Sequence, residues 1–191
     1  RLSFNDFKLL NLYFCSKNCL GSEHKCKNGG YLHWIQCGTC ICPKGFQGRD
    51  CGYIKPISHY CNETILVASK EEKILSLEKN KTCNYLIRSE SKTKVYVSIT
   101  RVQTRERKDK GDVCLPHLGF EIRYLNDKGI TGLSLCGRYN DIVIVSQGPE
   151  VYIEYHGLDP NNYFVLSYAD TTSNFTESRI TYEGKSFKVN N

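Results

Sequence analysis

Apolar and polar residues alternate with period two in three segments of the chain. These segments are "KVYVSIT" (94–100), "GFEIRYL" (119–125) and "EVYIEYHG" (150–157). Such alternation is typical of β-strands with one buried face, and the turn-forming residues "NDKG" (126–129) follow the second segment. The pattern predicts an all-β domain in which antiparallel strands form a β-sandwich.

The first residues of the chain show a helical pattern instead. In "LSFNDFKLLNLYFC", Ser3 is a good N-cap residue with Asp6 three positions later. Phe7, Leu10 and Phe14 then lie on one helical face. We therefore expect a short amphipathic helix at the N-terminus, in a chain that is otherwise mainly β.

Cysteine usage divides the chain into two regions. The sequence of 191 residues holds 11 cysteines, and seven of them lie between Cys15 and Cys51. The remaining four are spread over the next 85 positions. A Pro-containing stretch without clear periodicity, "GYIKPISHY", separates the two regions. This change predicts a small stapled module followed by a larger domain that has its own core.

Three chemistries can use the cysteine-rich stretch. A redox site would need a helix after "CGTC" (37–40), but "ICPKGFQG" contains Pro43 and two glycines that break a helix. Zinc would need a Cys/His quartet, and the C-x-x-C spacing occurs once, with His24 and His33 nearby. A disulfide framework of six cysteines fits the spacing best, although the spacing alone leaves 15 pairings open.

The stretches "CKNGGY" and "CICPKGFQGRDC" resemble an epidermal-growth-factor-like (EGF-like) module. The short gap between its third and fourth cysteines is similar to that of the module found in nematode astacin-type zinc metallopeptidases. The acidic pattern of calcium-binding modules is missing before it, so we expect no calcium there. The resemblance implies three disulfides: Cys19–Cys37, Cys26–Cys40 and Cys42–Cys51.

The N-terminal helix strengthens this resemblance. It is similar to the last helix of astacin catalytic domains, and the matching residues are Ser3, Asp6, Asn11, Tyr13 and Cys15. In that family the cysteine that ends this helix is bridged to another part of the catalytic domain. Cys15 is therefore expected to lack a partner in this chain, with a free thiol or an intermolecular bridge as alternatives.

The region from about residue 61 to 170 resembles a CUB domain. Two cysteine pairs are each 22 positions apart, and "SLCG" is followed by "SQGPEVYIEYHG" and "NYFVLSYA". The resemblance implies the disulfides Cys61–Cys83 and Cys114–Cys136. The expected organisation is a catalytic-domain helix remnant (1–18), an EGF-like module (19–54), a CUB-like domain (55–171) and a flexible tail (172–191).

Many CUB domains bind calcium through acidic loop residues, one of them an Asp shortly after the third cysteine. In the matching stretch "LGFEI", Leu118 stands at that position. Strand alternation sends Glu121 away from the core side, so we do not expect it to replace the Asp. Asp112 and Asp141 are the remaining candidates, and we expect no functional calcium site.

The sequence lacks the residues of an astacin active site. Its five His are dispersed at positions 24, 33, 59, 117 and 156, and the zinc motif H-E-x-x-H-x-x-G-x-x-H and Met are both absent. Ser134 has no G-x-S-x-G elbow around it. We expect no catalysis, no catalytic residue and no bound metal in this chain alone, whereas the resemblance implies zinc in the parent enzyme.

Charge and processing signals indicate the compartment and the partners. The formal charge is +6, and "RVQTRERKDK" (101–110) is the densest basic run. Its interspersed acids favour a solvated loop over nucleic-acid or heparin binding. No apolar run is long enough for a membrane span.

Sequons at Asn62, Asn80 and Asn174 predict glycosylation and a secreted, extracellular protein. Without Met, the chain is expected to be a processed product or a fragment.

Two functions remain open at this point. The chain is expected to be the non-catalytic region of a secreted astacin-like zinc metalloendopeptidase, where it would bind a protein substrate or an extracellular partner. The alternative is a free-standing EGF–CUB binding protein. Trp34 and Ile35, in a loop that offers little burial, are candidate contact residues, or else pack onto the neighbouring domain. The oligomeric state is left open.

Overall fold

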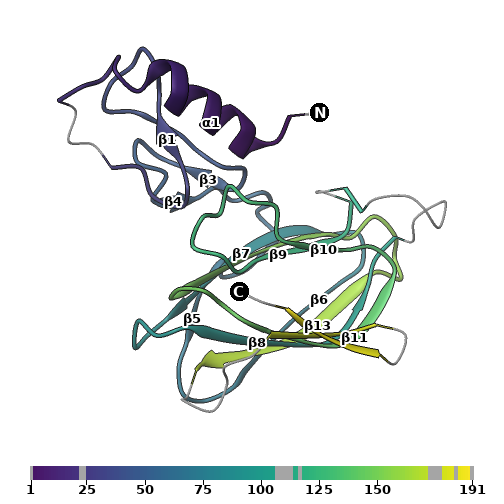
Figure 1. The fold of residues 1–191 in the computed structure, drawn as a ribbon. Helices are drawn as coiled ribbons and strands as arrows, with labels where there is room; N and C mark the ends of the chain where they lie inside the picture. Colours follow the sequence, from purple (N-terminus) through teal and green to yellow (C-terminus); the bar gives the residue numbers. More distant parts are fainter. Residues whose placement is uncertain are drawn as a thin grey trace. The chain divides into compact units, whose positions relative to one another are not determined.

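The computed structural model describes residues 2–21, 25–105, 114–115, 118–171, 178–182 and 185–189. The chain forms two compact units (Figure 1). Unit 1 comprises residues 1–56 and the loop 126–131, and unit 2 comprises residues 57–125 and 132–191.

Unit 1 begins with the expected helix, α1 (Phe4–Cys15). Ser3 caps it in a capping box, because the Ser3 hydroxyl accepts from Asp6 N and the Asp6 carboxylate accepts from Ser3 N. These bonds lower the pKa of Asp6. The ring of Phe4 packs against Tyr31, with centroids 5.3 Å apart, and Lys8 donates to Gly29 O. The helix therefore rests on the module through its first two turns.

The rest of unit 1 consists of two short antiparallel pairs. Strand β1 (Tyr31–Leu32) pairs with β2 (Cys40–Ile41), and β3 (Phe46–Gln47) pairs with β4 (Tyr53–Ile54). Few side chains are buried among the described residues of this unit. Apart from cysteines, the buried apolar side chains are Tyr31, Pro43, Phe46 and Ile54.

Unit 2 is a sandwich of two sheets (Figure 1). The five-stranded sheet has the order β10-β9-β12-β7-β5, and the six-stranded sheet has the order β15-β14-β11-β8-β13-β6. The first contains β5 (Ile65–Ala68), β7 (Thr82–Ser89), β9 (Phe120–Arg123), β10 (Leu133–Leu135) and β12 (Glu150–His156). The second contains β6 (Lys73–Glu78), β8 (Val95–Gln103), β11 (Arg138–Val145), β13 (Tyr163–Asp170), β14 (Ser178–Tyr182) and β15 (Lys185–Val189).

The three alternating segments of the sequence form β8, β9 and β12, which confirms the mainly β sandwich. Their apolar positions lie in one buried cluster between the sheets. Phe164 is at its centre, with ring centroids 5.2 Å from Phe120 and 5.1 Å from Tyr155. All strand pairs are antiparallel except β5–β7, which is parallel. The alternation of apolar and polar residues does not predict this parallel pairing at the edge of the sheet.

The segment 172–191, which we expect to be a flexible tail, contains two described strands. The described part of this segment forms the hairpin β14–β15, and β14 extends the six-stranded sheet through the pairing Val143↔Arg179. The Ser178 hydroxyl accepts from Val145 N, and Ile180 packs against the core cluster. Among the described residues of the hairpin, Ile180 is the apolar side chain that packs against the core, so the sequence shows little periodicity here. The flexibility of the segment stays a prediction.

Candidate functional site

The structure brings ten of the 11 cysteines together as disulfides. Unit 1 contains Cys19–Cys37, Cys26–Cys40 and Cys42–Cys51. Unit 2 contains Cys61–Cys83 and Cys114–Cys136. Cys15 forms no disulfide with any residue that the structure describes.

Cys15 ends a helix whose apolar side chains are exposed. No residue of α1 is buried. Six large apolar side chains of the helix are at least 46% exposed: Phe7, Leu9, Leu10, Leu12, Tyr13 and Phe14. A contiguous apolar surface of this kind is typical of an interaction site.

A groove of about 430 Å³ lies between this helix and the disulfide-stapled module of unit 1. The helix contributes Lys8, Asn11, Leu12, Cys15 and Ser16, and the module contributes Cys19, Lys25, Cys26, Gly30, Tyr31, Leu32, His33 and Trp34. We call this feature the helix–module groove. The sequence identified Trp34 as a candidate contact residue. It did not place Asn11 and Lys25 in the same site, because the groove depends on how the helix packs on the module.

Trp34 is held in place although it is 43% exposed. Its ring stacks on the His33 ring at a centroid distance of 4.4 Å, and its carbonyl accepts from Asn18 Nδ2. The neighbouring Ile35 is 74% exposed. His33 Nδ1 accepts from the backbone N–H groups of Ile35 and Gln36. The proton of the neutral His33 ring is therefore on Nε2.

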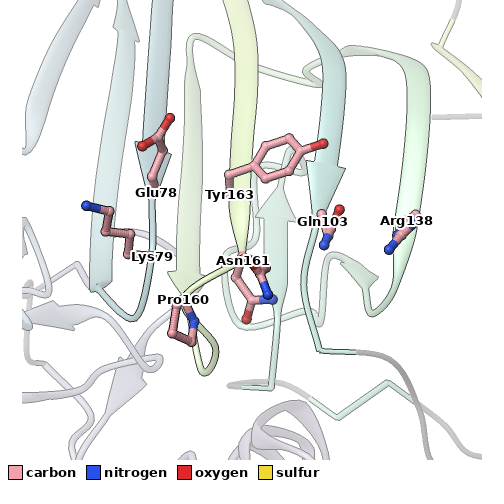
Figure 2. Close-up of a pocket in the computed structure, with 8 residues that line it drawn as sticks. Glu78, Lys79, Gln103, Arg138, Pro160, Asn161 and Tyr163 are labelled. Atoms are coloured by element: carbon pink, nitrogen blue, oxygen red, sulfur yellow. The ribbon is translucent and has the colours of Figure 1, made fainter.

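Unit 2 has a second depression, of about 480 Å³, at one end of the six-stranded sheet (Figure 2). Four of its side chains form a row across neighbouring strands, because Tyr163 is opposite both Glu78 and Gln103, and Gln103 is opposite Arg138. Lys79 and the loop residues 160–162 complete the lining. Such a row depends on the pairing register of four strands, so no local sequence motif predicts it.

Of the residues considered for calcium, Glu121 is already hydrogen-bonded and Asp141 is exposed. Glu121 accepts from Arg123 Nε at 2.8 Å and from Gly132 N. Its neighbours Phe120 and Ile122 point into the core. Asp141 is exposed on β11, and Asp112 lies outside the described residues. The prediction that unit 2 lacks a functional calcium site stays a prediction.

The described residues do not fit a zinc site. No group of three or more His, Cys, Asp or Glu is arranged to hold a metal ion in the part of the chain that the structure describes. His33, His59 and His156 are described, whereas His24 and His117 are not. Ser134 is on strand β10. We therefore assign no catalytic step to these residues.

The glycosylation candidates differ in how they are placed. Asn62 and Asn80 are exposed, the second at the turn between β6 and β7. Asn174 and much of the basic run 101–110 lie outside the described residues. In the described part of the chain, no helix is long and apolar enough to cross a bilayer.

Comparison with known proteins gives relatives over most of the chain, although no protein-family model matches it. Zinc metalloproteinase nas-34 of Caenorhabditis elegans is 28% identical over 179 residues, covering 94% of this chain and 28% of that protein. Zinc metalloproteinase nas-37 of the same organism is 32% identical over 158 residues, covering 82% and 19%. Zinc metalloproteinase dpy-31 of Brugia malayi is 29% identical over 143 residues, covering 71% and 23%.

The chain thus spans about a quarter of the length of these relatives. Among solved structures, the CUB1-EGF-CUB2 domain of human MASP-1/3 matches 77% of this chain and 49% of that chain with 18% identity. The TM-score is 0.44, which is too low to support a conclusion. By its sequence relatives, the chain is similar to a part of nematode astacin-type zinc metalloproteinases.

Proposed function

We propose that the chain is the non-catalytic EGF-like and CUB-like region of a secreted astacin-like zinc metalloendopeptidase. In this role it binds a protein substrate or an extracellular partner and helps to localise the enzyme. The zinc and the catalytic residues belong to a catalytic domain of which α1 is the last helix. The similarity to nematode zinc metalloproteinases supports this assignment.

The uncovered helix α1 is the observation that carries the proposal. Its apolar side chains are exposed and its last residue, Cys15, has no disulfide partner among the described residues. Covering such a surface lowers the free energy by roughly 25 cal/mol per Å² of apolar area removed from water. A catalytic domain would cover the face of α1 that Leu9, Leu10, Tyr13 and Phe14 form, which shares no residue with the lining of the groove, and would supply the partner for Cys15.

The secreted location is part of the proposal. Five disulfides are typical of proteins that fold in an oxidising compartment. The exposed sequon residues Asn62 and Asn80 are accessible to the glycosylation machinery. Glycopeptide mapping of protein from a secreting eukaryotic host should find carbohydrate on both residues.

The test is the coding sequence upstream of Arg1 together with a thiol count. The upstream sequence should encode H-E-x-x-H-x-x-G-x-x-H followed by a Met-containing turn. Denatured, unreduced chain 1–191 should show one reactive thiol, at Cys15, and the longer protein should show that thiol consumed. An upstream sequence without the zinc motif would contradict the peptidase assignment and favour a free-standing binding protein. Cys15 bridged to Cys19 would contradict the module assignment.

A further inference from the structure

The net positive charge of the protein is concentrated in unit 1. This unit holds nine Lys or Arg and four Asp or Glu, and the whole chain has a formal charge of +6. Five of the six net charges therefore belong to unit 1, and unit 2, which has about twice as many residues, is nearly neutral. Such an asymmetry attracts acidic partners to one unit and not to the other.

Three side chains at the helix–module groove, Asn11, His33 and Lys25, present hydrogen-bond donors. Asn11 Nδ2 is buried and has no acceptor among the described residues. His33 presents an Nε2–H, because its Nδ1 already accepts from two backbone N–H groups. Lys25 is exposed at the rim, whereas Lys8 is already bonded to Gly29 O and Asp127. A ligand that matches Asn11, His33 and Lys25 must therefore supply acceptor oxygens.

The apolar part of the same groove is rigid and accessible. Leu12 is 51% exposed on the helix side, and Trp34 is 43% exposed on the module side. Trp34 is held by its stacking on His33 and by the bond from Asn18. An aromatic side chain that is already fixed loses little entropy on binding, which is typical of an anchor residue in an interface.

We propose that the helix–module groove binds an acidic segment of a partner protein. An apolar side chain of the segment packs between Leu12 and Trp34, and its carboxylate and carbonyl oxygens accept from Lys25, Asn11 and His33. The apolar walls favour a protein segment over a sulfated polysaccharide, which carries charge without apolar side chains. The concave shape favours it over a lipid surface. This inference goes beyond the proposed function, because it names a site and a partner chemistry.

Trp34 allows a direct test, since it is the single Trp of the chain. The probe is a short Trp-free peptide of Asp, Glu, Leu and Phe, titrated into the intact chain 1–191. We expect a saturable blue shift of Trp34 emission that weakens as salt is added. Two control peptides, one with Lys for the acidic residues and one with Ser for Leu and Phe, should give no saturable shift.

Matched variants separate the groove from general electrostatic attraction. Lys25→Glu should weaken peptide binding about tenfold or more, and Leu12→Ser should weaken it by a similar factor. Lys70→Glu makes the same change in net charge in unit 2 and should leave the affinity within about twofold. Disulfide mapping and unchanged Trp34 emission before titration show that each variant is folded.

Three outcomes would overturn the proposal. The acidic peptide gives no saturable shift up to millimolar concentration, or Lys25→Glu and Lys70→Glu weaken binding equally. In the third, heparin fragments or phosphatidylserine vesicles produce the shift and the acidic peptide does not, which would assign the groove to a polysaccharide or a membrane surface instead.

Discussion

Unit 1 and unit 2 are held together by different interactions. Unit 2 buries a cluster of 20 residues between two sheets. Unit 1 buries four apolar side chains other than cysteines among its described residues, and three disulfides cross-link its short hairpins. A module of this size cannot exclude enough apolar surface from water, so cross-links that restrict the unfolded chain take the place of a core.

This difference explains why the two units present different surfaces. A domain with a hydrophobic core depends on burying its large apolar side chains, so each one that faces water is a loss of stability. A stapled module keeps its fold while Trp34 and Ile35 are exposed. Unit 1 can therefore combine exposed apolar side chains with high positive charge, and unit 2 carries its apolar side chains mainly inside.

Removal of one disulfide from each unit should have the largest and most unequal effect. The bridges Cys26–Cys40 and Cys61–Cys83 close loops with separations of 14 and 22 residues, so their entropic contributions are similar, each about 2–5 kcal/mol. Cys26→Ser with Cys40→Ser should unfold unit 1, seen as a red shift of Trp34 emission. Cys61→Ser with Cys83→Ser should lower the Tm of unit 2 but leave it folded at 25 °C.

A core truncation in unit 2 should come next in size. Phe164 is fully buried and contacts the rings of Phe120 and Tyr155. Phe164→Ala should lower the free energy of unfolding of unit 2 by about 3–5 kcal/mol in a urea titration followed by circular dichroism. Trp34 emission under native conditions should not change. A loss below about 1 kcal/mol would mean that the two sheets do not share this core.

Asp170 should give a smaller effect that depends on pH. Its Oδ2 accepts from Ser91 N and Ser91 Oγ. Burial alone raises the pKa of Asp170, but the bonds from Ser91 and Ser89 outweigh it, so the pKa is lowered. The resulting stability is present above the unfolded pKa of about 3.9 and is lost as pH falls through the folded pKa.

Asp170→Asn should therefore cost about 1 kcal/mol at pH 7 and progressively less as the pH approaches 3. Urea titrations of both proteins at several pH values measure this difference. A cost that stays constant with pH would show that the carboxylate charge contributes nothing.

Calcium should have the smallest effect. Leu118 stands where a ligand Asp is expected, and Glu121 is bonded to Arg123. The Tm of unit 2 should be the same in calcium and in chelator. A clear stabilisation by calcium at millimolar concentration or below would mean that other oxygen ligands form a site, and that the CUB alignment at Leu118 is wrong.

The sequence predicted features that depend on local pattern. The capping box of Ser3 and Asp6 and the inward positions of β8, β9 and β12 follow from residues close together in the chain. The hairpin β14–β15 was missed, because its stability comes from the pairing of β14 with β11, a strand more than thirty residues earlier.

The candidate sites were harder to predict than the fold. The sequence pointed to Trp34 by its position in a short loop, but Asn11 and Lys25 become parts of one groove only when helix and module are packed together. Likewise, the row from Glu78 to Arg138 requires the register of four strands. No characteristic residue spacing predicts either arrangement, because tertiary packing brings the residues together.

Hydrogen–deuterium exchange of the intact chain with and without a thiol reductant tests the comparison of the two units most directly. Reduction should remove the protection of β1–β4 and shift Trp34 emission to the red, whereas β8, β11 and β13 keep most of their protection. Equal loss of protection in both units would contradict the account, because it would show that disulfides hold the sandwich as well. Retained protection of β1–β4 after full reduction would also contradict the account, because it would show that unit 1 has a sufficient core of its own.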